Sequence, residues 1–116
     1  MAAKSAPVRS MSSLLTWARN WHTGGSVKSN GWANANFDQP PQSRITCQSH
    51  VYNSAGQHGT YTNSQGPYGG NYCPETGLAV LGGVVPTYYT TWTKSWWRWS
   101  DETQGYGIAE QTHYED

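Results

Sequence analysis

The clearest periodic pattern in the chain is the alternation of apolar and polar positions over residues 44–53. Ile45, Cys47 and Val51 fall on one side of this segment. The polar positions on the other side are Arg44, Thr46, Gln48 and His50. Because successive side chains of a strand point to opposite faces, this period of two predicts a strand with one face in a core.

Less regular runs predict further strands over residues 25–37, 78–85, 86–100 and 105–114. Asn30 and Gly31 form a dipeptide that is typical of hairpins, so we expect a tight turn there. Residues 54–71 are rich in Gly, Gln, Asn and Ser, which predicts a short hairpin followed by a long exposed loop. Short strands with regularly spaced turns indicate an all-β fold, either an antiparallel β-sandwich or a small barrel.

Residues 14–22 fit two different periods. A helix capped by Ser13 and ended by the Gly pair at 24–25 is one interpretation. Its apolar face would hold Leu14, Trp17, Ala18 and Trp21. The alternative is a strand with Leu15, Trp17 and Trp21 on one side. The expected fold is therefore all-β with at most one short helix, near the N-terminus.

The densest aromatic segment is residues 87–100, TYYTTWTKSWWRWS, with four of the seven Trp and no aliphatic residue. Aromatic and Thr residues favour strands, and alternation divides the six rings into two sets. One set is Tyr89, Trp97 and Trp99, and the other is Tyr88, Trp92 and Trp96. A core can absorb one face, but the other requires a second layer, a partner subunit or a flat ligand such as a sugar. We therefore predict a binding surface among these six residues.

The composition predicts a core with few aliphatic residues. The chain has 116 residues with thirteen Gly, one Phe and only 12% charged residues, which is about half the usual charged fraction. This length suits one domain over residues 13–116 and is too short for two. Because aliphatic residues are few, we expect aromatic rings to supply much of the buried area.

The charges are unevenly distributed although they sum to zero. The first half is basic, the second half is acidic, and the tail ends in Glu115 and Asp116. Residues 1–12 are expected to form a flexible arm, in which Lys4 and Arg9 would contact the acidic half of another subunit. Zero net charge argues against nucleic acid or an anionic membrane as a general partner.

Cys47 and Cys73 suggest one intrachain disulfide, which would stabilise a thin core. A zinc site using these thiols with His50 and His58 is the less favoured alternative, because the second half of a zinc signature is missing. We predict no metal and no cofactor.

The sequence predicts no enzyme. Asp101 and Glu102 are adjacent and would point to opposite faces of a strand, and no nucleophile elbow or phosphate loop is present. No segment has the length and hydropathy of a membrane span, and no secretory signal is recognisable. We expect a location in a virion or outside the cell.

These features favour a structural or interaction protein. The first hypothesis is a subunit of a virion, such as a phage-type capsid, decoration or tail component, or of another extracellular assembly, with the aromatic strand between subunits. The alternative is a lectin-like module that stacks sugars on Trp and Tyr. Single-stranded nucleic acid is less favoured, because net positive charge is absent. Its binding residues would be Lys94, Trp96, Trp97, Arg98 and Trp99.

Overall fold

The computed structural model describes residues 12–37, 39–100 and 102–115. Within them lie nine strands and no helix, in two antiparallel sheets packed together. The strands are β1 (Ser12–Ser13), β2 (Leu15–Thr23), β3 (Ser26–Asn34), β4 (Arg44–Asn53), β5 (His58–Gln65), β6 (Tyr72–Cys73), β7 (Ala79–Gly82), β8 (Thr87–Trp99) and β9 (Glu102–Glu115). The all-β sandwich predicted from the sequence is confirmed.

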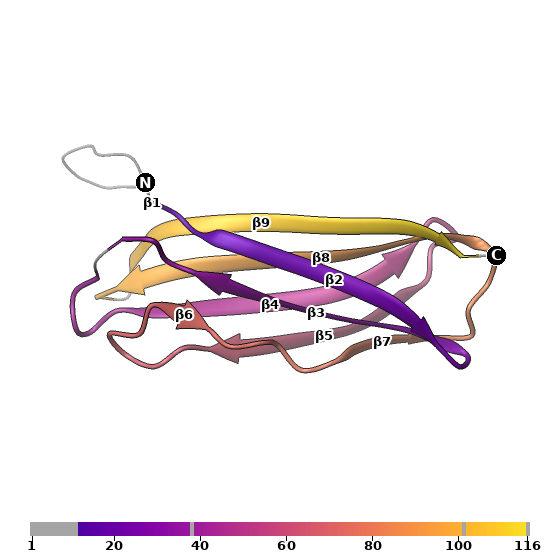
Figure 1. Cartoon of the computed structure of the whole chain (residues 1–116), viewed down its shortest axis with the longest axis horizontal. Coiled ribbons are helices and arrows are strands. Elements are labelled where there is room, and N and C mark those ends of the chain that lie inside the picture. The colour runs from indigo at the N-terminus through magenta and orange to yellow at the C-terminus, as the bar shows by residue number, and fades with distance from the viewer. Residues whose placement is uncertain (1–11, 38, 101, 116) are drawn as a thin grey trace.

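The large sheet has the strand order β1-β9-β8-β4-β5, and the small sheet has β2-β3-β6 with β7 also paired to β3. All pairings are antiparallel except that of β1 with β9. In Figure 1 β9 runs above β2 along the upper edge, and β8 passes behind β2, so the large sheet lies behind the small one. Among the described residues no helix is long and apolar enough to cross a membrane.

Residues 15–22 lie in the strand β2, so the helix interpretation of residues 14–22 is wrong. β2 pairs with β3 along its whole length, from Leu15 opposite Asn34 to Thr23 opposite Ser26. Leu15 and Trp17 share one side, as the strand interpretation predicted, but both are exposed. The small side chain of Ala18 and the polar Thr16 lie on the inward side. The segment forms a strand because it pairs with β3, whereas its own sequence fits a helix and a strand equally well.

The predicted tight turn lies elsewhere. Asn30 and Gly31 are in the middle of β3, and the tight turn of this hairpin is at Gly24, which has a positive φ of 58°. A Cβ on Gly31 would lie 2.1 Å from Oγ1 of Thr93, so Gly31 serves close sheet packing rather than a turn. Within residues 54–71, where a short hairpin and a long exposed loop were expected, residues 58–65 form β5, which pairs with β4.

The core has apolar ends and a polar middle. One apolar cluster surrounds Ile45 and Trp97, and the other surrounds Val51 and Tyr89. Between them lie small hydroxyl side chains, with hydrogen bonds of 2.8 Å between Ser49 and Thr93 and 2.7 Å between Thr16 and Ser95. The sheets therefore approach too closely in the middle to admit large rings.

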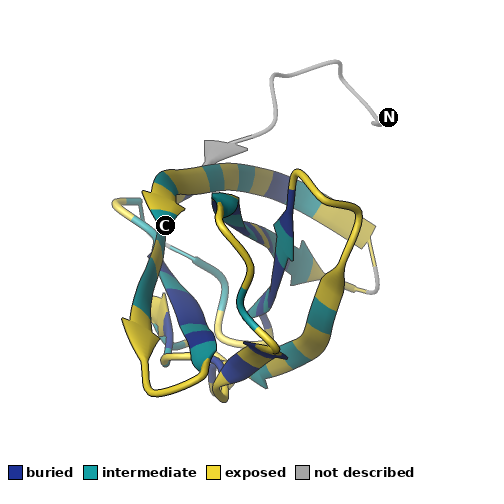
Figure 2. Cartoon of the chain, turned by 90° about the vertical axis from the view of Figure 1, so that its right-hand side faces the viewer, coloured by how far each residue is buried: buried dark blue, intermediate teal, exposed yellow. Residues whose placement is uncertain are grey.

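The aromatic rings consequently lie mostly outside the core, against the expectation that they supply much of its buried area. Of the seven Trp and eight Tyr, all of which are described, only Trp97 and Tyr89 belong to the buried core. Figure 2 shows buried, intermediate and exposed positions alternating along the strands. Thr, Ser, Val and Cys fill the interior instead.

Both open sides of the sandwich are closed by contacts between the sheets. On one side, Asn20 of β2 hydrogen-bonds to Gln111 of β9 through both its backbone and its side chain. On the other side, the Val80 amide of β7 donates to Oγ1 of Thr60 in β5 at 3.0 Å. The strands therefore surround the core, as the end-on view in Figure 2 shows.

Candidate binding surface

β8 divides the six predicted binding residues between the core and the surface. Tyr89 is fully buried, and its hydroxyl donates to the carbonyl of Val85 and accepts from its amide, both at 2.8 Å. Trp97 packs edge-on against Phe37 in the core. The structure therefore gives Tyr89 and Trp97 a role in packing within one chain.

The other set, Tyr88, Trp92 and Trp96, lies on the outer face of the large sheet. Tyr88 is exposed, while Trp92 and Trp96 are half-buried among neighbouring side chains. Trp99 is exposed at the hairpin end of β8. The outer face thus keeps three of the predicted rings together and joins them to side chains of β4, β5 and β9.

His50 is the centre of an aromatic cluster on this face. Its ring lies 4.3 Å from that of Tyr61 and 5.4 Å from those of Tyr52 and Trp92. Burial lowers the pKa of His50, and the charge of His58 lowers it further. The cluster is therefore built around a neutral imidazole.

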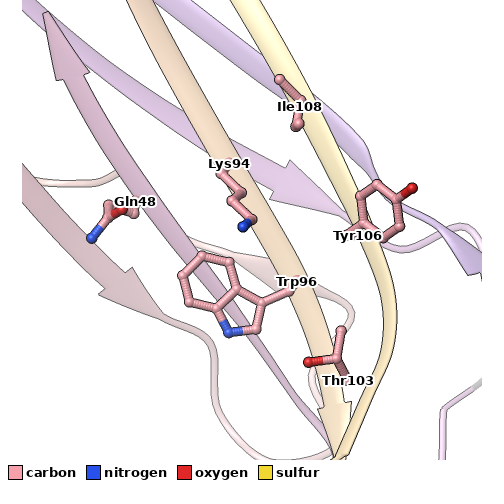
Figure 3. A pocket seen from close by; sticks show the side chains of 6 residues that line it. All are labelled: Gln48, Lys94, Trp96, Thr103, Tyr106 and Ile108. Carbon is pink, nitrogen blue, oxygen red and sulfur yellow. The ribbon is translucent and has the colours of Figure 1, made fainter. Parts of the chain in front are cut away.

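A groove of about 410 Å³ lies beside this cluster. Its lining residues come from three adjacent strands, β4, β8 and β9. They are Gln48, Lys94, Trp96, Thr103, Tyr106 and Ile108. Figure 3 shows Trp96 at its centre, with Gln48 on one side and Tyr106 on the other. Nζ of Lys94 lies 5.8 Å from the centroid of the Trp96 ring.

Register explains why these residues meet. Trp96 lies opposite Tyr106 of β9 and Thr46 of β4, and Lys94 lies opposite Ile108 and Gln48. Tyr106, Ile108 and Gln48 were not among the predicted site residues. The spacing of two between Tyr106 and Ile108 was a signal that they share a face, but the strands that would flank them could not be read from it.

A second aromatic surface covers the small sheet. The rings of Trp17 and Trp32 are stacked 5.5 Å apart, and the guanidinium of Arg19 lies 5.2 Å from Trp32 and 5.5 Å from Trp21. Glu75 accepts from Arg19 at 3.0 Å. A basic residue of the first half thus meets an acidic residue of the second half within one chain.

The two cysteines lie together in one core cluster as free thiols. The hydrogen bond to Cys73, together with burial, raises the pKa of the Cys47 thiol. Cys73 Sγ also lies 3.4 Å from the carbonyl oxygen of Ser64. The pair bridges β4 of the large sheet and β6 of the small sheet, and the disulfide stays a prediction.

The zinc alternative does not match this arrangement. Cys47 faces the core, whereas His50 belongs to the aromatic cluster on the outer face of the same strand. Over the described ranges, no three His, Cys, Asp or Glu side chains come together in a group that would hold a metal ion. Lys4 and Arg9 of the predicted assembly arm lie outside the described residues.

The sequence matches no known protein family and no curated protein. Among solved structures, one similar chain is a beta-glucuronidase from glycoside hydrolase family 2, at 12% identity and a TM-score of 0.46 over 84% of this chain and 11% of that one. Another is a beta-glycosidase from Bacteroides vulgatus, at 6% identity and a TM-score of 0.43 over 82% of this chain and 12% of that one. This chain therefore spans a small part of either neighbour's length, and likenesses of this degree identify neither a family nor a function.

Proposed function

We propose that the chain is a non-enzymatic carbohydrate-binding domain that holds its glycan on the outer face of the large sheet. The observation that carries this proposal is the groove around Trp96. Its volume of about 410 Å³ lies within the range of roughly 300–1,000 Å³ that is usual for small-ligand sites. The ring of Trp96 provides an apolar plane for a sugar ring.

The neighbours of Trp96 have the chemistry that sugar hydroxyls require. Gln48 and Thr103 line the groove with an amide and a hydroxyl, and Tyr106 adds a phenol beside its ring. On the neighbouring strand β5, Asn63 lies opposite Gln48 and Gln65 lies opposite Thr46. Apolar planes and hydrogen-bonding groups thus alternate over this face.

Closure of the strand edges supports binding through an outer face. β5 is linked to β7 and β2 to β9 by side-chain hydrogen bonds. Addition of a partner strand requires an unpaired sheet edge. A ligand with a flat apolar side therefore has a better fit to the aromatic faces than a peptide that extends a sheet.

The test is a glycan array followed by calorimetric titration of the strongest glycan. Trp96→Ala should weaken binding by about 2 kcal/mol or more, as expected for a central Trp. Trp17→Ala, on the opposite outer face, is the matched control and should bind as the wild type does. Absence of binding to every glycan on the array would contradict the proposal.

A second candidate is the subunit of an extracellular assembly, such as a virion, with this face between subunits. It is favoured by the pair of Tyr88 and Tyr114, whose rings pack edge-on at 5.0 Å although each residue is 54% exposed. In this case sedimentation should reveal an oligomer that Tyr88→Ala weakens, and the array should show no glycan. A monomer at high protein concentration would exclude self-assembly through this face.

A further inference from the structure

One residue that lines the groove on the large sheet, Lys94, carries a positive charge. Lys94 is exposed on β8, and its ammonium lies over the ring of Trp96. No ion pair of Lys94 is present among the described residues. Glu110 projects from the same face, opposite Trp92 on a neighbouring rung, and does not pair with Lys94. The positive charge therefore lines the groove without a paired carboxylate among the described residues.

A ligand that matches this groove combines a ring with an anion. Stacking on Trp96 would fix the plane of a sugar ring, and the ammonium beside it would meet a substituent at the ring edge. Charge-assisted hydrogen bonds from Lys to a carboxylate are about twice as strong as neutral ones. A neutral sugar has no anionic group with which the Lys94 ammonium could form such a charge-assisted hydrogen bond.

We infer that the groove selects acidic glycans, whose sugar ring stacks on Trp96 and whose carboxylate pairs with Lys94. This inference rests on the proposed carbohydrate binding and narrows its ligand to sugars with a carboxyl group. Gln48 and Thr103, which line the groove on either side, then hydrogen-bond to the hydroxyls of the same sugar.

The first experiment uses an array that carries neutral, carboxylated and sulfated oligosaccharides together with single-stranded oligonucleotides. We expect binding to be confined to carboxylated glycans. Binding to neutral glycans alone would overturn the inference but leave the proposed function intact. Binding to sulfated chains or oligonucleotides as strongly as to carboxylated glycans would show a general polyanion site and would also overturn it. Failure of every glycan would remove the proposed function itself.

The second experiment compares the strongest carboxylated glycan with its methyl ester by calorimetry. The wild type should bind the acid at least about tenfold more tightly, and Lys94→Met should remove this preference while keeping the affinity for the ester. Lys94→Arg should retain the preference, because the charge remains. Lys28→Met makes the same change on the other outer face and should leave both affinities unchanged. Equal affinity of the wild type for acid and ester would contradict the inference.

Discussion

Residue size decides where the rings of this protein lie. Gly31 allows the middle of β3 to rest on Ser49 and Thr93 of the large sheet, because any Cβ there would overlap both side chains. An interior of this thickness has room for Ser, Thr and Val, and large rings fit only near its ends, as Trp97 and Tyr89 do. The same residues that make the core thin therefore place the other rings on the outer faces.

His50 is expected to make stability depend on pH. Burial lowers its pKa in the folded state below the value in the unfolded chain, so the unfolded chain binds more protons as the pH falls through about 6.5. The contribution of His50 to stability is therefore complete above that pH and decreases below it. His50→Phe keeps a ring in the stack and should flatten this part of the profile, measured by denaturant unfolding between pH 5 and 8. An unchanged slope in this variant would contradict the assignment.

The two thiols should form a disulfide under oxidising conditions, because they already contact each other in the core. The bond would add about 2–4 kcal/mol of stability. Because the hydrogen bond with Cys47 lowers the pKa of the Cys73 thiol, the thiolate of Cys73 starts the oxidation, which should accelerate as the pH increases. Mass spectrometry after alkylation, with and without reductant, measures the bond. Complete alkylation of both thiols in the unreduced, unfolded protein would contradict the prediction.

At the scale of elements, alternation along the chain revealed strands but not their inward face. β4 was predictable from its period of two over ten residues, and β8 from its aromatic and Thr residues. β2 was ambiguous, because Trp17 and Trp21 fit a helical face as well as a strand face. Even the correct strand interpretation could not say that Trp17 faces outward, because that depends on the thickness of a core assembled from distant segments.

The candidate site was predictable to a similar extent. Alternation grouped Tyr88, Trp92 and Trp96 correctly, and this set lies on one outer face. It could not show that Tyr89 and Trp97 are the buried set, because the two sets have similar chemistry. The groove also depends on Tyr106 and Gln48, which reach Trp96 only through the register of β9 and β4.

Closure of the sheet edges also depends on small residues. A Cβ on Gly59 would lie 2.4 Å from the carbonyl oxygen of Val80, so a larger residue would push β5 away from β7. Gly59→Val should cost about 1–3 kcal/mol of stability and expose a sheet edge that promotes aggregation. Unfolding curves and light scattering measure the two effects.

Gly82→Val on β7 is the control for this prediction. A Cβ on Gly82 meets no atom within 4 Å, so the variant should remain monomeric with near wild-type stability. Equal behaviour of the two variants would show that close contact between β5 and β7 does not protect the edge.

At the scale of the whole molecule, two aromatic surfaces lie back to back across a thin sandwich. The small-sheet surface is occupied by its own contacts, since Arg19 fills the space between Trp32 and Trp21 and is held by Glu75. The large-sheet surface keeps a groove beside Trp96. The basic and acidic halves of the sequence do not become separate poles, because Arg19 of the first half forms an ion pair with Glu75 of the second.

The central claim is that the outer face of the large sheet is the binding face, and the indole signals of the seven Trp test it directly. A ¹H–¹⁵N correlation spectrum recorded during titration with the strongest array glycan should show shifts for Trp96 and, to a smaller extent, Trp92. The signals of Trp17, Trp21 and Trp32 should stay in place, because they lie on the opposite outer face. Shifts confined to these three, with Trp96 unmoved, would contradict the account.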